Sequence, residues 1–210
     1  FLVELFVAIP LGIVAATKQY SRTDYAITVF ALMGISLPTF FLATILKYVF
    51  SIKLGWFDLY GVTGRLHTSM SPFIKIVDMA YHLVLPIVTL MMLSVGGLMR
   101  YTRTNMLEVL NSDYIRTARA KGLSEKVVIN KHAFRNTLIP LVSYMSYLLP
   151  SMFGGAMITE TLYRIPGIGY IAFEAITRGD IPFSMFYTTF NILLAQVSLL
   201  IADIMYAVVD

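Results

Sequence analysis

Cysteine is absent from this sequence of 210 residues. A disulfide framework, a thiolate metal site and a cysteine nucleophile are therefore excluded for these residues. Charged residues are also scarce: they make up 13% of the sequence, whereas a soluble domain usually carries about 25%. Hydrophobic residues make up 58%. This composition indicates that lipid is the main solvent of the chain.

Motifs for catalysis are missing as well. No Lys follows a Gly, so the Gly-x-x-x-x-Gly-Lys-Ser/Thr loop that cradles nucleotide phosphates does not occur. An intramembrane enzyme would need paired Asp residues, a Ser/His pair or a His-Glu-x-x-His motif within apolar segments. Asp203 is the only Asp inside such a segment, and the metal motif does not occur. The run 167–172 fits a dinucleotide fingerprint only by chance, because no βαβ context surrounds it. We therefore expect a non-catalytic chain.

Five apolar runs account for most of the sequence. They are 1–16, 25–50, 83–99, 138–159 and 184–209. A helix needs about 17–25 such residues to cross a bilayer, and all but the first run meet that length. Continuous apolar runs without alternation argue against a barrel, and a backbone in lipid must satisfy its own hydrogen bonds as helix. A soluble bundle would keep a polar face on its helices, which 138–159 and 184–209 almost lack. The sequence predicts an all-α, polytopic membrane helix bundle.

Lysine and arginine predict the orientation of these helices, because cytoplasmic loops carry an excess of them. The segments 17–24 and 100–137 hold ten, whereas 51–82 and 160–182 hold five. We expect the first two segments in the cytoplasm and the other two outside. The net charge of +4 then reflects membrane orientation and requires no nucleic-acid partner. The chain begins inside an apolar run without an initiator Met, so we expect a further helix upstream and six spans in total.

The histidines do not indicate a metal site. In this topology His132 lies on the opposite side of the membrane from His67 and His82, so the three cannot bind one ion. We expect no metal in this chain.

The segment 100–137 has the pattern of two helices joined by a glycine. The apolar positions of the predicted first helix are Leu107, Leu110, Tyr114 and Ala118. Asp113 suits its start and Lys121 its end, as the helix dipole prefers. Gly122 can stop it, because glycine accepts left-handed backbone, and Ser124 can cap the second helix. Spacing alone leaves two interpretations: a solvated loop beside acidic headgroups, or a docking surface for a cytoplasmic partner.

The centre of this segment resembles a known motif. Residues 113–124, Asp-Tyr-Ile-Arg-Thr-Ala-Arg-Ala-Lys-Gly-Leu-Ser, are similar to the EAA loop of permeases from binding-protein-dependent ABC importers. The general motif is Glu-Ala-Ala, three residues, Gly, nine residues and Ile-x-Leu-Pro, and only Ala118 and Gly122 match it. The basic Arg116 and the run His-Ala-Phe-Arg-Asn at 132–136 resemble the oligopeptide and dipeptide permease branch.

Further segments extend the resemblance over nearly the whole chain. Residues 82–86 are similar to the entry of the family's fourth helix, 160–169 to the segment outside its fifth, and 202–210 to its last helix. The resemblance implies the type I ABC importer (MetI-like) transmembrane domain over 1–210. Five of its six helices would be present, with the cytoplasmic coupling loop at 100–137.

The same resemblance implies partners and a location. They are two cytoplasmic ATPase subunits that bind ATP and Mg²⁺, a second homologous permease subunit, an extracytoplasmic peptide-binding protein and the peptide itself, in the bacterial cytoplasmic membrane. This chain would hold no cofactor of its own. The expected ATPase contact is Arg116, Thr117, Ala118, Arg119, Ala120, Lys121, Gly122, Leu123 and Ser124. Its basic residues would supply positive charge, Gly122 the bend, and Leu123 an apolar contact.

One related function remains open. A permease for nickel or a nickel chelate belongs to the same family and shares these motifs. Few His and acidic ligands are available to strip a metal, although a chelate would not need them. A secondary transporter would lack the ATPase-docking elbow.

Polar residues within apolar runs are costly and are candidates for function. Asn191, Gln196 and Asp203 could line the path, and interhelical hydrogen bonds are the alternative, which we prefer for Asp203. Glu4 suits either an interfacial position or the pore, and Lys47 can snorkel to the outer surface. Kinks are predicted at Pro38, Pro86 and Pro150. Close helix approach is predicted at Gly96, Gly97, Gly154 and Gly155.

Overall fold

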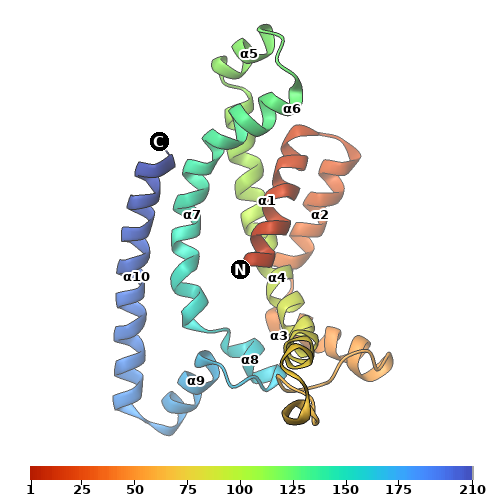
Figure 1. Cartoon of the computed structure of the whole chain (residues 1–210), viewed down its shortest axis with the longest axis vertical. Helices are drawn as coiled ribbons and strands as arrows, with labels where there is room; N and C mark the ends of the chain where they lie inside the picture. The colour runs from red at the N-terminus through yellow and green to blue at the C-terminus, as the bar shows by residue number, and fades with distance from the viewer. Residues whose placement is uncertain (210) are drawn as a thin grey trace. The chain divides into compact units, whose positions relative to one another are not determined.

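The computed structural model shows a helical chain (Figure 1). It describes residues 1–209, except for the side chains of 145–150, 152, 153 and 206–209. The α-helices are α1 (Leu2–Thr17), α2 (Arg22–Ser36), α3 (Thr39–Leu46), α4 (Pro72–Leu110), α5 (Asp113–Ala120), α6 (Glu125–Val127), α7 (Phe134–Gly154), α8 (Met157–Tyr163), α9 (Ile168–Arg178) and α10 (Ile181–Val209). Shorter turns are the π-helical η1 (Lys47–Lys53) and η3 (Val128–Ala133) and the 3-10 turn η2 (His67–Ser69). No strand occurs within the described residues, and the predicted all-α class is confirmed.

The helices pack as two compact units. Unit 1 comprises Phe1–Ile35, Ser94–Pro150 and Leu193–Asp210, and unit 2 comprises Ser36–Leu93 and Ser151–Ile192. Helices α4 and α10 contribute to both. The predicted cytoplasmic segments belong to unit 1 and the predicted external segments to unit 2.

Two helices of the described residues are long and apolar enough to cross a membrane by themselves. They are Pro72–Leu110 and Ile181–Met205, and the broken pair Arg22–Ser36 and Thr39–Lys53 adds a third if it is counted as one span. Helix α1 is apolar but short, as expected for the first run. The fourth run, 138–159, was predicted as one span, but it is divided between α7, which ends at Gly154, and α8, which begins at Met157.

The predicted span at 25–50 is not one continuous helix. Helix α2 ends at Ser36 and α3 begins at Thr39, with Pro38 in extended backbone at φ −61° and ψ 140°. Proline lacks an N–H and restricts the residue before it to extended backbone, so Leu37 cannot continue the helix. A kink at Pro38 was predicted, whereas the structure shows a full interruption of the helix. Pro86 lies inside α4, which continues through it, and Pro150 lies outside the described residues.

Helix α4 is longer than the span predicted at 83–99. It has 39 residues, whereas about 20 cross the hydrocarbon core. Its first turns lie in the predicted external segment and its last turns in the predicted cytoplasmic one. The loops at 51–82 and 100–137 are therefore shorter than expected, because each includes part of α4.

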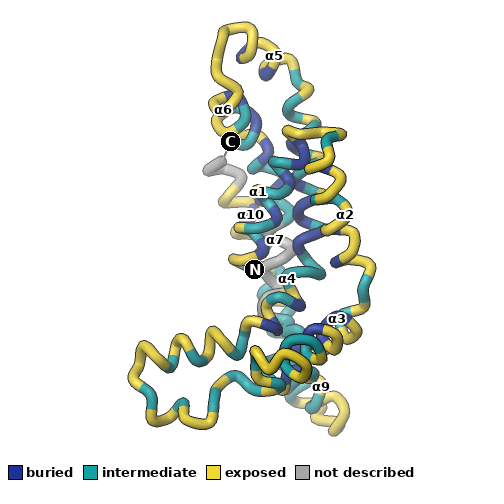
Figure 2. Tube along the Cα trace, turned by 90° about the vertical axis from the view of Figure 1, so that its right-hand side faces the viewer, coloured by how far each residue is buried: buried dark blue, intermediate teal, exposed yellow. Residues whose placement is uncertain are grey.

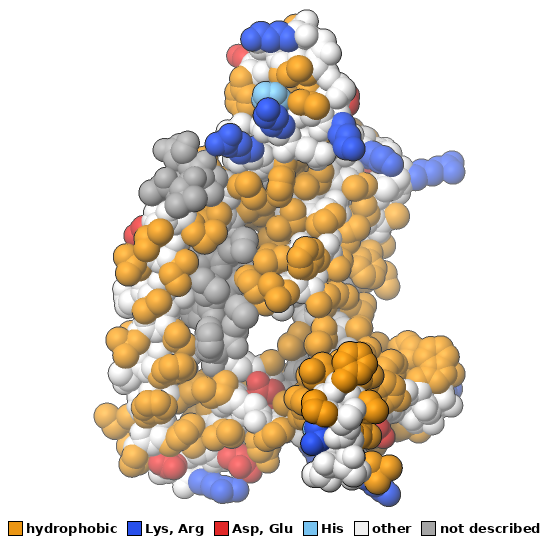
Figure 3. All heavy atoms as spheres, viewed as in Figure 1, with side chains coloured by type: hydrophobic (Ala, Val, Ile, Leu, Met, Phe, Trp, Pro, Cys, Tyr) orange, Lys and Arg blue, Asp and Glu red, His pale blue; other side chains and the backbone are white. Residues whose placement is uncertain are grey.

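Apolar side chains cover much of the exposed surface. Figure 3 shows hydrophobic groups over the helices and a group of Lys and Arg side chains over the end that carries α5 and α6. Only 11% of the apolar window of α10 is buried inside the chain. Exposed apolar area of this extent is typical of a surface that contacts lipid or another membrane subunit.

Small residues form the helix contacts of unit 1. The buried positions on α1 are Glu4, Ala8, Gly12, Ala15 and Ala16, which recur at helical spacing along one face (Figure 2 colours the chain by burial). A Cβ atom at Gly12 would lie 2.6 Å from Thr102 Cβ, and one at Gly96 would lie 2.5 Å from the Ala31 carbonyl oxygen. The predicted close approach at Gly96 is confirmed. At Gly97 the nearest atom is the Tyr144 hydroxyl oxygen, 3.2 Å away.

Unit 2 has its own apolar core. It contains Leu42, Ala43, Leu46, Leu85 and Tyr163. Tyr163 is 2% exposed, and its hydroxyl oxygen lies 3.0 Å from the Thr89 hydroxyl oxygen. Because a buried hydroxyl needs a partner, this hydrogen bond lets a tyrosine fill the centre of an apolar core.

Candidate functional site

The predicted helix–glycine–helix elbow is present in unit 1. Helix α5 follows Ser112, and Asp113 lies in its first turn, where a negative charge suits the helix dipole. Gly122 follows the last helical turn with φ +74°. Ser124 then precedes α6 in extended backbone, at the N-cap position, without a side-chain capping bond. We define the elbow as residues 112–127; its bend lies at Gly122 as predicted, whereas its first helix begins at Asp113 and does not include Leu107 and Leu110.

A Schellman motif ends α5. The Leu123 N–H donates to the Ala118 carbonyl at 3.4 Å, and the Gly122 N–H donates to the Arg119 carbonyl at 2.9 Å. This pattern requires a left-handed residue at Gly122, which glycine adopts without a Cβ penalty. No atom of the described residues lies within 4 Å of a Cβ built on Gly122. A substitution there would change the backbone preference and the outer surface, but not the packing within the chain.

The buried face of α5 differs from the predicted one. Ile115 and Ala118 are buried, whereas Tyr114 is 47% exposed. Leu107 and Leu110 lie on α4, because the chain leaves the helix at residues 111–112. The apolar spacing predicted from Leu107 to Ala118 therefore does not describe one helix. The exposed Tyr114 is available to a partner.

The elbow is anchored on the core of unit 1. Its buried residues pack in one cluster with the neighbouring ends of other elements in unit 1. The cluster consists of Ala16, Met106, Ile115, Ala118, Val128 and Ala133. The Thr137 hydroxyl in α7 donates to the Ala133 carbonyl at 3.0 Å and lies 3.2 Å from Met106 Sδ. The elbow is therefore packed directly against α1, α4 and η3.

An ion pair joins the two arms of the elbow. Arg119 Nε donates to Glu125 Oε1 at 2.7 Å, and its Nη2 donates to Oε2 at 3.4 Å. Arg116 forms a longer contact of 3.4 Å with Asp113 one turn earlier. Lys121 is exposed and forms no ion pair within the described residues. Of the three basic residues predicted to face a partner, Arg119 has the closest acidic partner within its own chain.

A pocket of about 260 Å³ lies beside the elbow. Its wall contains both members of the Arg119–Glu125 pair and residues of α1, α4 and η3. The lining residues are Ala16, Thr17, Gln19, Leu107, Leu110, Asn111, Arg119, Glu125 and Ile129. The pocket therefore opens between the elbow and the helices that support it.

Sequence reasoning missed a second ion pair in unit 1. Arg103 donates to both Asp24 oxygens, from Nε at 2.9 Å and from Nη2 at 2.8 Å. The Tyr20 N–H also donates to Asp24, at 3.0 Å. Arg103 was counted only as a loop charge. The available signal was one acid at the start of α2 and one Arg at the end of the predicted third span, but only the fold shows that they meet.

The three path candidates have different surroundings on α10. Asn191, in unit 2, donates to the Tyr187 carbonyl of its own helix at 2.9 Å. Gln196 and Asp203, in unit 1, are exposed. No helix–helix hydrogen bond of Asp203 occurs among the described residues, so its side chain faces the outside of the chain.

Glu4 and Lys47 both have hydrogen-bond partners within the chain, which the sequence did not indicate. Glu4 is 7% exposed and hydrogen-bonds to Ser94, which places it inside unit 1. Its Oε1 atom has no hydrogen-bond partner among the described residues. The Lys47 ammonium, expected to snorkel, donates to the Leu162 carbonyl at 2.6 Å in unit 2.

Two of the histidines meet in unit 2. His67 Nδ1 lies 2.6 Å and His82 Nδ1 lies 3.5 Å from the carboxylate of Asp78. The Gly64 N–H donates to the same carboxylate at 3.0 Å. These contacts attach the segment before α4 to the helix. No group of three His, Cys, Asp or Glu side chains suited to a metal ion occurs among the described residues.

Glu160 organises the turn between α8 and α9. Its carboxylate accepts from the Ala156 N–H at 2.8 Å and from the Tyr170 N–H at 2.7 Å. A side chain at Gly167 would collide with this carboxylate, and one at Gly155 would collide with the Gly169 backbone. The glycines of the motif at 160–169 thus allow Glu160 to reach two backbone donors.

Next to this turn, the Tyr170 hydroxyl donates to Glu174 at 2.9 Å. This hydrogen bond favours the neutral phenol and raises the pKa of Tyr170. Glu174 also accepts from Arg178 at 3.2 Å. The carboxylates of Glu160 and Glu174 are therefore both engaged within unit 2.

Comparison with known proteins identifies the relatives of this chain. The model of a family described as "Binding-protein-dependent transport system inner membrane component" matches residues 8–210. The oligopeptide transport system permease protein AppB of Bacillus subtilis is 41% identical over 209 residues, which cover 100% of this chain and 65% of AppB.

Two further relatives have similar names. The putative peptide permease protein BOV_A0351 of Brucella ovis is 36% identical over 99% of this chain and 64% of its own length. The dipeptide transport system permease protein DppB of Alkalihalophilus pseudofirmus is 40% identical over 85% of this chain and 57% of its own length. The match thus covers between 57% and 65% of the length of these three relatives.

Proposed function

The chain belongs to the family of inner membrane components of binding-protein-dependent transport systems, and from this premise we propose that it is the permease subunit of an ATP-driven peptide importer. The observation that carries the proposal is the elbow at 112–127, anchored on the ends of helices in unit 1. The names of the relatives support peptides as the cargo over nickel.

In this proposal the elbow receives the energy of ATP hydrolysis from another protein. Two cytoplasmic ATPase subunits bind ATP and Mg²⁺, because this sequence has no phosphate-binding loop of the Gly-Lys type. Leu123 and Tyr114 are exposed on the elbow and supply apolar contacts to one ATPase subunit. Arg116 and Lys121 supply positive charge, while the Arg119–Glu125 pair keeps the two arms together.

Coupling follows from the packing of the elbow. Ile115 and Ala118 share a cluster with residues of α1, α4 and η3, so a displaced elbow pulls these helices with it. When ATP binding closes the ATPase pair, the helices switch as rigid bodies between inward-open and outward-open states. A second homologous permease completes the path, and an extracytoplasmic binding protein delivers the peptide. The chain lies in the bacterial cytoplasmic membrane, with 17–24 and 100–137 inside and 51–82 and 160–182 outside.

The experiment compares Gly122→Asp with Gly179→Asp in the full-length protein. Both glycines have positive φ, +74° and +71°, and neither has an atom of the described residues within 4 Å of a Cβ built on it. The backbone cost of the two substitutions is therefore matched, and only the location differs.

We expect Gly122→Asp to abolish peptide uptake and copurification of the ATPase subunits, with normal membrane insertion. Gly179→Asp, at the end of α9, should retain both. If Gly122→Asp retains uptake and ATPase binding, the docking role of the elbow is wrong and the importer proposal loses its mechanism.

A further inference from the structure

Arg164 occupies an unusual position at the end of α8. Its φ is +52° and its ψ is 46°, and among the described residues only Tyr20 is another non-glycine residue with positive φ. Left-handed backbone costs an L-residue free energy that glycine would not lose. This backbone ends α8, with the Ile165 N–H donating to the Glu160 carbonyl at 2.8 Å, and an arginine in place of glycine there directs attention to the contacts of its side chain.

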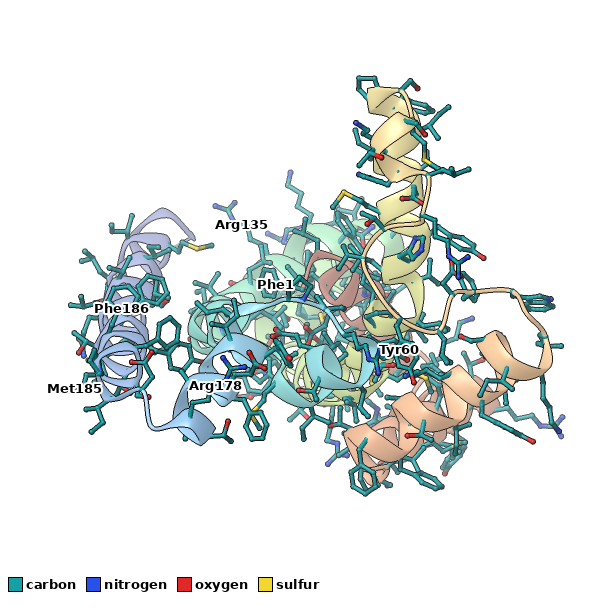
Figure 4. All side chains as sticks on the ribbon, turned by 90° about the horizontal axis from the view of Figure 1, so that it is seen from below. Phe1, Tyr60, Arg135, Arg178, Met185 and Phe186 are labelled. Atoms are coloured by element: carbon teal, nitrogen blue, oxygen red, sulfur yellow. The ribbon has the colours of Figure 1, made fainter. Side chains whose placement is uncertain are left out.

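The guanidinium of Arg164 stacks on an aromatic ring. Its Cζ atom lies 4.4 Å from the ring centroid of Tyr60 (Tyr60 is labelled in Figure 4). The Lys47 ammonium lies 4.0 Å from the same centroid. Stacking uses the face of a guanidinium and leaves the N–H groups at its edge available as donors.

The positive charge at this ring is not neutralised by the described residues. Neither Arg164 nor Lys47 forms an ion pair within them. The carboxylates nearest in sequence, Glu160 and Glu174, bind backbone N–H groups, Tyr170 and Arg178 instead. Two cations against one ring without an acidic partner make an electrostatic site for an anion.

A pocket lies at this guanidinium. It has a volume of about 320 Å³ and is lined by Thr161, Arg164, Ile165, Pro166 and Tyr170. Arg164 and the Thr161 hydroxyl provide polar donors, and Ile165 and Pro166 provide an apolar wall. This combination suits a carboxylate attached to an apolar group, as at the end of a peptide.

We propose that this pocket binds the C-terminal carboxylate of the peptide cargo, with Arg164 as the bidentate donor. The proposal rests on the proposed function. Every linear peptide carries one terminal carboxylate, so a site for that group recognises peptides without regard to their sequence. Arginine is well suited to the role, because its N–H fork matches the geometry of a carboxylate. Lys47 adds positive potential and holds the Tyr60 ring on which Arg164 stacks.

The test uses the full-length protein with its partner subunits in proteoliposomes, with ATP inside and the binding protein outside. Uptake is measured for one peptide as the free acid and as the C-terminal amide. The ratio of the two rates is compared between the wild type and Arg164→Asn. Asn accepts left-handed backbone well, so this substitution removes the charge without adding strain at φ +52°.

The matched control is Arg178→Asn. Arg178 lies in the same unit, is exposed, and pairs with Glu174, so its loss should not affect cargo binding. Because one binding protein serves all variants, its own preference for the free acid cancels in the comparison.

We expect the ratio of free acid to amide to fall by about tenfold in Arg164→Asn, as for the loss of one charge-assisted hydrogen-bonded pair. The Arg178→Asn variant should retain the wild-type ratio. An unchanged ratio in Arg164→Asn, or equal losses for both peptides, would overturn the subsite. If the wild type imports neither peptide, the proposed function fails; if the wild type imports the peptides and the ratio is unchanged in Arg164→Asn, only the subsite fails.

Discussion

Replacing Arg103 by Ala should destabilise the protein more than replacing Asp24 by Asn. The Asp24 side chain is 4% exposed and the Arg103 side chain is 25% exposed. Loss of Arg103 leaves a buried carboxylate without a counter-charge, whereas loss of the Asp24 charge leaves a guanidinium that reaches water. The order of the two effects therefore follows from which partner is more deeply buried.

The magnitudes follow from the contacts. Removing the cation from a buried pair costs about 3–5 kcal/mol, and we expect Arg103→Ala at the low end of that range because its side chain is partly exposed. Asp24→Asn retains the shape and one acceptor oxygen, so it should cost about 1.5–3 kcal/mol, the value of a hydrogen bond to a charged group.

The assay is denaturation of the purified full-length permease in detergent, with both single variants and the double variant in one thermodynamic cycle. The double variant should be more stable than the sum of the single losses predicts, because neither charge is left alone. Additive losses, or a larger loss for Asp24→Asn than for Arg103→Ala, would refute the reasoning from burial.

Two further predictions concern small residues and the outer turn. Gly96→Ala should lower the free energy of unfolding by about 1–3 kcal/mol, because the added Cβ meets the backbone of α2. Gly97→Ala should be nearly neutral, because its Cβ meets only the end of the Tyr144 side chain. Thermal unfolding of the two variants measures the difference, and equal stability would contradict the close approach at Gly96. Glu160→Gln should lower peptide uptake, because a neutral amide is a weaker acceptor for its two backbone N–H donors and must place an NH₂ group in the position of one carboxylate oxygen. Its control is Glu174→Gln, whose side chain accepts from the Tyr170 and Arg178 side chains and from no backbone N–H among the described residues. Equal uptake in the two variants would show that the Glu160 contacts are dispensable.

Local features of the elbow could be predicted from the sequence. Gly122 has the left-handed backbone that its place after a basic helix end indicated, and Ser124 is at the N-cap position of the next helix, although its side chain forms no capping bond. Both depend on the preferences of single residues and their neighbours. The apolar runs likewise became helices, because their backbone has no other way to satisfy its hydrogen bonds in lipid.

Features that depend on distant contacts could not be predicted. The buried face of α5 is set by Met106 and Val128, which lie on other elements, and the helix break before Asp113 shifted the expected period. The pair of Asp24 and Arg103 joins residues 79 positions apart. Composition and spacing contain no signal for such a pair until the helices are placed side by side.

Site-specific crosslinking at the elbow tests the central claim most directly. This sequence has no cysteine, so a single Cys at Leu123 gives a unique attachment point in the described chain. Leu123 is 40% exposed, and the control, Ile181→Cys, is 67% exposed and lies in unit 2 outside the elbow. In the assembled transporter we predict that a short crosslinker joins Leu123→Cys to an ATPase subunit and does not join Ile181→Cys to it. No crosslink from Leu123→Cys, or an equal yield from both positions, would contradict the proposal that the elbow receives the energy of ATP hydrolysis.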